Sequence, residues 1–186
     1  EIIEQVVYCE MREAQRGLYD AVHQQTEKDM LDLAGGGANE GRMRMAVFAQ
    51  LLKLRQVCSE PRLVDEKLRK EDSAKLETFL EILDDAMAGG HRLLVFSQFV
   101  QVLKKIRQEL EAREVGFCYL DGQTKDRMAQ VDRFQINDSV PVFLISLKAG
   151  GTGLNLTGAD MVVHFDPWWN PAAEAQQVEP GVPTML

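Results

Sequence analysis

Cysteine is scarce in this sequence, and long apolar runs are absent. The three cysteines, Cys9, Cys58 and Cys118, are odd in number and widely spaced, so they predict neither a disulfide framework nor a zinc site. The three histidines are equally scattered, and no metal site is expected. No apolar run approaches the roughly 20 residues of a membrane-spanning helix, and the acidic first residues differ from a signal peptide. We therefore expect no membrane partner and a cytoplasmic location in a bacterium or archaeon, or a nuclear one in a eukaryote.

Positive charge is also in short supply. The 186 residues carry a formal net charge of -8, which argues against a nucleic-acid partner because phosphate binding normally needs a basic surface. The balance is uneven: residues 1–90 hold 12 basic and 18 acidic side chains, 91–135 hold 8 and 6, and 136–186 hold 1 and 5. Only the middle segment is positive, so a DNA partner has to be argued from motifs.

What the chain does contain is the composition of an ordinary globular protein, with 45% hydrophobic and 27% charged residues. Its length suits one α/β domain with a small appendage. Residues 1–70 predict a helical extension. They contain a strand at 5–10, a helix at 12–33, a glycine break at 35–37, and a second helix from about 42 that ends at Pro61.

From residue 71 to 176, apolar runs of strand length alternate with apolar spacing of helical period. We expect helices at 73–88, 102–110 and 125–135, and strands at 93–96, 117–120, 142–145 and 161–165. Strands that are apolar throughout are buried on both faces, and strands separated by helices pair in parallel through right-handed crossovers. The predicted fold class is therefore α/β, a doubly wound parallel sheet flanked by helices. Ligands bind such sheets beyond the carboxyl ends of the strands, here the loops 97–98, 121–124, 146–153 and 166–170.

The loop from Ser146 to Leu156 contains three glycines. Glycine lets backbone N–H groups approach an anion closely, and Lys148 adds a positive charge. The same glycines also suit a tight turn that binds nothing, and glycine content alone does not decide between the two. The loop is neither a Walker A sequence nor a Gly-x-Gly-x-x-Gly dinucleotide fingerprint.

Taken with the run that follows it, this loop resembles motif V of the superfamily 2 helicase-like motors. The run at 157–176, with Asp-Pro-Trp-Trp-Asn-Pro at its centre, resembles the Swi/Snf branch of those motors. The resemblance implies a RecA-like C-terminal motor lobe. It also implies nucleotide-binding residues and contacts to the DNA backbone in the loop. The nucleotide-binding residues would be Gly151, Thr152 and Gly153, and the DNA contacts Ser146 and Lys148.

Residues 166–170 are expected to form a short, rigid corner. Pro167 keeps Asp166 extended, and Asn170 followed by Pro171 is a typical helix-start pairing. A plain packing role in the core is the alternative for at least one of the two tryptophans. The resemblance implies that this corner supports the cleft between two motor lobes, through Asp166, Trp168, Trp169 and Asn170.

Two further segments resemble elements of the same family. Residues 92–99 look like motif IV, with Ser97 and Gln98 placed to contact the DNA backbone. Residues 119–124 resemble an element that usually reads Leu-Asp-Gly-Ser-Thr, with Gln123 in place of the serine. Gly122 and Thr124 match and are expected to contact DNA, although Thr124 also suits a plain helix cap.

The lead-in sequence at 54–63 is similar to a family segment that commonly ends Cys-x-His-Pro. Glu60 stands in place of the histidine, and we expect the segment to be structural. The resemblance covers about residues 5–176 and is most specific over 92–176.

Parts of such a motor are missing from the sequence. The family's motif VI, whose arginines reach the ATP phosphates, should follow the tryptophans, but the last arginine is Arg133. The tail at 177–186 contains two prolines and a glycine, so we expect a lobe truncated before motif VI and a disordered tail. No catalytic residue is expected here, because the Walker A and Asp-Glu motifs of a first lobe are absent too. ATP and Mg²⁺ are expected as cofactors of a two-lobe parent protein, with none tightly bound to this chain.

The resulting expectation is a C-terminal lobe of an ATP-dependent translocase of the chromatin-remodelling type. Its partners would be double-stranded DNA and the missing N-terminal motor lobe. One alternative is a superfamily 2 motor that acts on RNA or single strands, which the tryptophan run disfavours. Another is a non-catalytic α/β module that binds a small ligand or a protein, and a Walker A motif upstream in the parent would argue against it.

Overall fold

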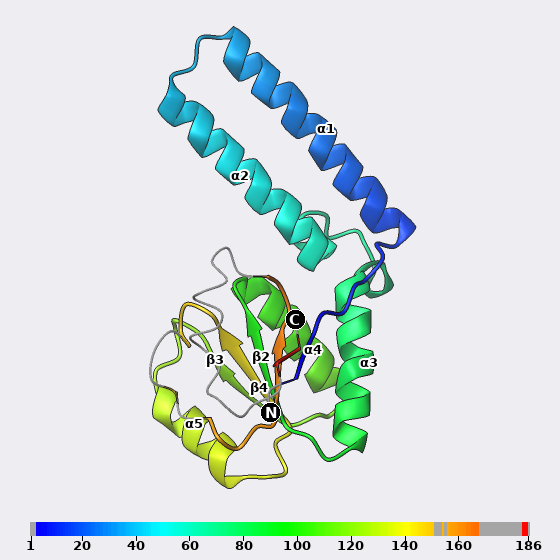
Figure 1. Cartoon of the computed structure of the whole chain (residues 1–186), viewed down its shortest axis with the longest axis vertical. Coiled ribbons are helices and arrows are strands. Elements are labelled where there is room, and N and C mark those ends of the chain that lie inside the picture. Colours follow the sequence, from blue (N-terminus) through cyan, green and yellow to red (C-terminus); the bar gives the residue numbers. More distant parts are fainter. Residues whose placement is uncertain (1–2, 151–153, 155, 168–183, 186) are drawn as a thin grey trace. The chain divides into compact units, whose positions relative to one another are not determined.

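The computed structural model describes residues 3–150, 154, 156–167 and 184–185 (Figure 1). They divide into a helical unit, residues 9–78, and a sheet unit made of residues 3–8 and the described residues from 79 onward. The boundary between these two compact units lies inside helix α3, Ala74–Ala88. In the described part of the chain, no helix is both long enough and apolar enough to cross a bilayer.

The helical unit is built on α1, Glu13–Gly35, and α2, Glu40–Ser59, which lie side by side (Figure 1). Their contact buries Val22, Leu54 and Val57. The Asn39 side chain accepts a hydrogen bond from the Arg42 backbone N–H at 2.9 Å and so caps the start of α2. The two helices predicted in this part of the chain are confirmed. The reversal between them uses Gly37, whose φ of 68° favours glycine.

A buried glutamine explains why the first turn of α3 belongs to the helical unit. Gln15, 1% exposed, donates from Nε2 to the carbonyl oxygen of Val57 at 2.9 Å. Its Oε1 accepts from the backbone N–H of Ala74 at 3.3 Å. One side chain of α1 therefore holds the end of α2 and the start of α3.

Glu60, in place of the family's histidine, is also buried, at 1% exposure. Its carboxylate accepts from the backbone N–H of Arg62 at 3.1 Å and from Nε of the same residue at 2.8 Å. It thereby caps the short 3₁₀ helix η1, Pro61–Leu63, which precedes a second one, η2, Lys70–Asp72. Because a buried carboxylate needs a charged donor, the Glu60–Arg62 pair accounts for the substitution in structural terms.

The sheet unit contains a parallel sheet in the order β1-β6-β5-β2-β4-β3. The strands are β1 Glu4–Gln5, β2 Leu93–Ser97, β3 Phe117–Leu120, β4 Val142–Ser146, β5 Met161–His164 and β6 Thr184–Met185. The central strands agree with the predicted ones. The predicted strand at 5–10 is wrong beyond Gln5. In the tail at 177–186, whose disorder stays a prediction, Thr184 and Met185 pair with strands β1 and β5. Residues 177–183 and 186 lie outside the described part.

Helices cover both faces of this sheet. Helix α5, Arg127–Ile136, packs Val131 and Phe134 on a cluster that includes Leu94, Phe96 and Phe143. Leu93, Val95 and Leu144, which alternate with those residues along the strands, are equally buried. Figure 1 shows α5 on one side of the strands and α3 and α4, Val100–Ala112, on the other. The predicted doubly wound α/β fold is confirmed.

Candidate functional site

The loops predicted to carry chemistry follow strands that are neighbours in the sheet. Strands β5, β2, β4 and β3 are adjacent in that order, and Ser97 pairs in register with Ser146. Because parallel strands point the same way, their carboxyl ends meet at one edge. We call this edge the loop edge. Its described residues are 97–98, 121–124, 146–150 and 165–167.

Ser97 and Asp166 join the ends of β2 and β5 at the loop edge. The Ser97 hydroxyl donates to Oδ1 of Asp166, and the backbone N–H of Gln98 donates to Oδ2 at 3.0 Å. Ser97 is 0% exposed and Asp166 1% exposed. The predicted contact between Ser97 and DNA stays a prediction; in this structure the Ser97 hydroxyl is buried and engaged with Asp166. Gln98 is only half-buried, and its side-chain amide donates to the carbonyl of Pro167 at 3.3 Å.

The turn after β3 is organised by Asp121. Its Oδ1 accepts from the backbone N–H of Gln123 at 2.8 Å, and its Oδ2 accepts from the Tyr119 hydroxyl at 3.0 Å. Burial first, and then this hydrogen bond, raise the pKa of the Tyr119 hydroxyl above its ordinary value, so the hydroxyl remains a donor. Thr124 Oγ1 accepts from the backbone N–H of Asp121 at 2.9 Å. Gly122 is exposed at the tip of the turn.

Thr124 is not the cap of the following helix, which was the plain alternative. The cap of α5 is Asp126, whose side chain accepts from the backbone N–H of Ala129 at 2.9 Å. The Thr124 hydroxyl also donates to Asp121 Oδ1, with a long oxygen–oxygen distance of 3.4 Å. Such a contact is weak, so this proton can turn toward an external acceptor at small cost.

The turn after β4 presents one exposed cation. The backbone N–H groups of Ala149 and Gly150 both donate to the carbonyl of Ser146, at 2.9 and 2.8 Å. Ser146 itself is 1% exposed, and its contact with DNA stays a prediction. Lys148, in contrast, is exposed.

Gly150 brings this turn close to the sheet. A Cβ at Gly150 would lie 3.0 Å from Ile145 Cγ2 and 3.3 Å from Phe96 Cε1. The turns after β3 and β4 are also tied to each other, because an Nη2 proton of Arg127 is donated to the carbonyl of Ala149. Six of the predicted site residues lie outside the described part of the chain. They are Gly151, Thr152, Gly153, Trp168, Trp169 and Asn170.

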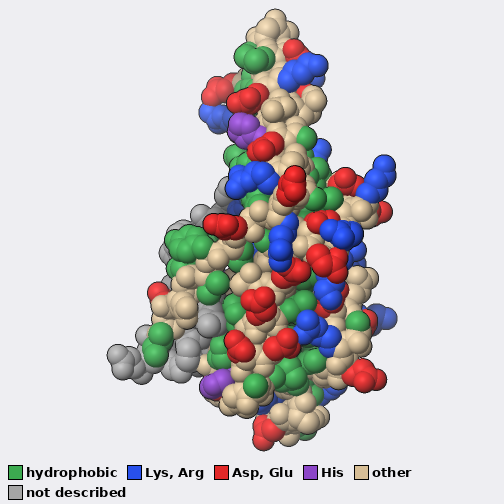
Figure 2. Space-filling view, turned by 90° about the vertical axis from the view of Figure 1, so that its right-hand side faces the viewer, with side chains coloured by type: hydrophobic (Ala, Val, Ile, Leu, Met, Phe, Trp, Pro, Cys, Tyr) green, Lys and Arg blue, Asp and Glu red, His purple; other side chains and the backbone are tan. Residues whose placement is uncertain are grey.

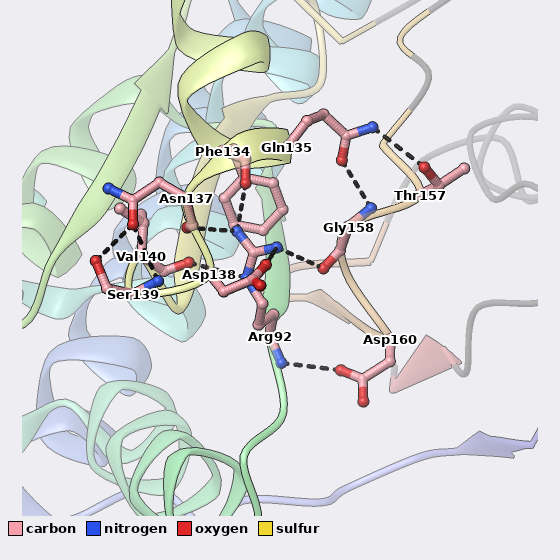
Figure 3. Close-up of polar contacts among 10 residues, drawn as sticks. All are labelled: Arg92, Phe134, Gln135, Asn137, Asp138, Ser139, Val140, Thr157, Gly158 and Asp160. Atoms are coloured by element: carbon pink, nitrogen blue, oxygen red, sulfur yellow. Dashed lines mark hydrogen bonds and ion pairs between the residues drawn. The ribbon is translucent and has the colours of Figure 1, made fainter.

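Sequence reasoning gave no role to Arg92, at the opposite edge of the sheet. Its guanidinium donates to the carbonyls of Val140 at 3.1 Å, Asn137 at 3.1 Å and Gly158 at 2.9 Å, and also to that of Phe134 (Figure 3). Asp160 accepts from the Arg92 backbone N–H at 2.9 Å, and from His91 Nδ1 at 2.6 Å. Burial raises the pKa of Asp160, but the His91 and Arg92 hydrogen bonds outweigh it and leave the pKa below its ordinary value. A lone arginine just before an apolar strand was the only signal in the sequence.

His164, at the end of β5, is 5% exposed and stacks on Phe96 with ring centroids 5.5 Å apart. Burial lowers the pKa of its imidazole to about 4, so the ring is neutral near pH 7. Among the described residues, no group of three or more His, Cys, Asp or Glu side chains is placed to hold a metal ion.

The surface charge is mixed where it can be inspected. On the face shown in Figure 2, acidic and basic side chains are interspersed rather than gathered into one basic patch. This agrees with the net charge of -8.

Comparisons with known proteins agree with this geometry. Residues 74–179 match the family described as helicase conserved C-terminal domain. Helicase SWR1 of Yarrowia lipolytica is 40% identical over 114 residues, which cover 60% of this chain and 6% of that protein. The chain thus corresponds to a small part of that relative's length.

Two solved structures from Sulfolobus solfataricus are similar to this chain over nearly its whole length. The SWI2/SNF2 ATPase C-terminal domain has a TM-score of 0.82 at 33% identity, covering 100% of this chain and 79% of that one. The SWI2/SNF2 ATPase core in complex with double-stranded DNA has a TM-score of 0.78 at 30% identity, covering 99% of this chain and 40% of that one.

Proposed function

Because the chain belongs to the helicase conserved C-terminal domain family and is a C-terminal lobe of the Swi/Snf type, we propose that it serves as half of a DNA-translocating motor. In this role the loop edge contacts the backbone of duplex DNA and forms one wall of an ATP cleft. The other wall belongs to a first motor lobe. ATP binding between the lobes closes them on DNA, and hydrolysis moves the pair along the backbone.

The proposal rests mainly on Lys148 and the turn at Gly122. Both are exposed, on loops that leave adjacent strands and are linked through Arg127 and Ala149. A lysine ammonium, the exposed backbone at Gly122 and the Thr124 hydroxyl are groups that bind phosphate oxygens without reading base sequence. Gln98 can add an amide on the next strand. Ser97 and Ser146 support this surface from beneath.

The nucleotide wall is assigned to Gly151, Thr152 and Gly153, which directly follow the turn that holds Lys148 and Gly150. Asp166, held by Ser97 and Gln98, fixes the end of β5 from which Trp168, Trp169 and Asn170 continue, and these residues support the cleft. Mg²⁺ would be bound by the first lobe, since the described residues here offer no acidic cluster. Duplex DNA is favoured as the track by the likeness to a core that was solved with double-stranded DNA.

The test uses a protein that carries this lobe together with its first motor lobe. Lys148→Ala should weaken binding to unrelated DNA duplexes by a similar factor. It should also reduce the slope of log affinity against log salt by about one, because roughly 0.9 counterion is released per phosphate contact. Lys104→Ala is the matched control, since Lys104 is an exposed lysine on α4 that is not one of the loop-edge residues. Fluorescence anisotropy at several salt concentrations measures both quantities. A loss confined to one sequence, or equal effects of the two variants, would refute the assignment.

A further inference from the structure

Lys148 lies between two buried neighbours in the turn at 146–150, which we call the Lys148 turn. Leu147 and Ala149 are each 3% exposed and pack in the core cluster that also contains Val131 of α5. The backbone N–H of Leu147 donates to the carbonyl of Ser97 at 3.0 Å. The exposed lysine side chain therefore projects from a short stretch of backbone that is anchored on both sides. Its direction depends on how these anchors are held.

A side chain of α5 holds the second anchor. Arg127, the first residue of α5, donates from Nη2 to the carbonyl of Ala149, 22 positions further along the chain. Arg127 lies one helical turn before Val131, so both side chains are on the same face of α5. Arg127 itself is exposed, so core packing does not explain the contact. A hydrogen bond from a charged donor is about twice as strong as a neutral one, and this one fixes the Lys148 turn against α5.

The same end of α5 also carries the turn at 121–124, which we call the Gly122 turn. Thr124 closes this turn by accepting from the backbone N–H of Asp121 at 2.9 Å. Two positions later, the Asp126 side chain caps α5. The two turns proposed to contact DNA are thus both attached to the first turn of α5. The Gly122 turn is attached through the chain itself, and the Lys148 turn through Arg127.

We propose that Arg127 is a positioning residue, which holds the Lys148 turn at a constant separation from the Gly122 turn so that both contact one DNA backbone together. This inference rests on the proposed function of the loop edge. Phosphates recur at a constant spacing along a strand, so two groups bind them together only if their own separation is kept. A loose Lys148 turn would have to be ordered during binding, and that ordering weakens affinity. Arg127 acts through Ala149 rather than through a phosphate of its own.

The first readout is hydrogen exchange in the 186-residue chain. The backbone N–H groups of Ala149 and Gly150, both bonded to the carbonyl of Ser146, report whether the Lys148 turn is closed. Arg127→Ala should speed exchange at these two amides by at least about tenfold. A larger change there than at Leu144, in the central strand β4, shows a local effect rather than a loss of overall stability.

Lys125→Ala is the matched control. Lys125 is exposed two positions before Arg127, so this variant removes a positive charge from the same stretch of chain. It leaves the bond between Arg127 and Ala149 in place. Exchange at Ala149 and Gly150 should therefore stay as it is in the unmodified chain.

The second readout is a double-variant cycle of DNA affinity in the two-lobe protein. Arg127→Ala should weaken binding by about three- to tenfold when Lys148 is present. In a Lys148→Ala background it should weaken binding by less than about twofold, because both changes then remove the same contact. The double variant should lose about one unit of slope in the plot of log affinity against log salt, as Lys148→Ala does alone. Lys125→Ala should have the same effect in both backgrounds.

The proposal is overturned if exchange at Ala149 and Gly150 does not change in Arg127→Ala. It is also overturned if the losses of affinity from Arg127→Ala and Lys148→Ala multiply and the double variant loses about two units of slope, because Arg127 would then bind a phosphate itself. An unchanged DNA affinity in Lys148→Ala would overturn the proposed function, and this inference with it. Multiplying losses alongside a clear effect of Lys148→Ala overturn this inference alone.

Discussion

The Ser97 hydroxyl donates a hydrogen bond to the Asp166 carboxylate, and both side chains are buried where β2 and β5 end. The contact spans 69 positions in the sequence and joins two strands that are neighbours in the sheet. A buried carboxylate is stable only while its oxygens have donors. The order of the loop edge therefore depends on this pair.

Removing the Ser97 hydroxyl should destabilise the folded chain. Ser97→Ala should lower the free energy of unfolding by about 1–3 kcal/mol, because the buried Asp166 carboxylate then loses a hydrogen bond. Asp166→Asn should also destabilise, and the two changes together should cost less than their sum. Urea unfolding of the two single variants and the double variant measures this. Strictly additive losses would mean that the hydrogen bond contributes nothing.

Stability should fall in weak acid because of His164. Its pKa is about 4 in the folded chain, against an ordinary value of 6.5, so below pH 6.5 the unfolded chain binds a proton that the folded chain does not. Above pH 6.5 the imidazole is neutral in both states and costs no stability. As the pH falls from 6.5 toward 4, the free energy of unfolding decreases. At about 1.4 kcal/mol per pKa unit, the loss approaches ~3 kcal/mol.

Urea unfolding between pH 4 and 8 checks this expectation. His164→Phe, which keeps an aromatic ring against Phe96, should flatten the dependence in this range. His23→Gln, at an exposed position of α1, should not. An unchanged slope in His164→Phe would assign the acid sensitivity to other groups.

The outer edge of β3 is covered by two side chains of α5. Gln130 Oε1 accepts from the backbone N–H of Tyr119 at 3.2 Å, and Arg133 Nη1 donates to the carbonyl of Phe117 at 3.2 Å. An uncovered strand edge is a template for pairing with other chains. The double variant Gln130→Ala/Arg133→Ala should therefore self-associate at concentrations where the unmodified chain does not. Light scattering reports this, with the exposed Asp132→Ala as the control.

The 186-residue chain alone should not hydrolyse ATP above background, with or without duplex DNA. Phosphoryl transfer needs the phosphates cradled, Mg²⁺ held, water oriented and developing charge neutralised. The sequence has no Walker A motif, its Asp65–Glu66 pair follows the short helix η1 rather than a strand, and no arginine lies beyond Arg133 for the fourth task. A phosphate-release assay combined with calorimetric titration of ATP and Mg²⁺ tests this. Steady DNA-stimulated release from a pure preparation would contradict it.

The sequence predicted the sheet unit well because its signals are local. Leu93–Phe96 and Val142–Ile145 are apolar throughout, which is typical of strands buried on both faces, and both became central strands. Parallel pairing then follows from the intervening helices, and it brings the predicted loops to one edge. The Gly-rich loop and the tryptophan run identified the family before any geometry was known.

The tertiary structure decided which of the predicted side chains are accessible. Ser97 and Ser146 look like surface hydroxyls in a motif, but strand register buries both, while Lys148 two residues later stays exposed. The roles of Arg92, Arg127 and Asp121 were also hidden. Each binds backbone or side-chain groups whose location depends on turns and strand order rather than on the residues adjacent in the sequence.

The sequence by itself thus determined the strand and helix pattern and the fold class, because helical spacing and apolar runs of strand length are properties of short segments. It also indicated the family, through the resemblance carried by the Gly-rich loop and the tryptophan run. Only the tertiary structure decided how the two edges of the sheet are held. The Ser97–Asp166 pair and the Arg92–Gly158 contact join residues 69 and 66 positions apart. Such contacts are fixed by the strand order and by the burial of polar groups that must find partners, and neither can be deduced from local periodicity.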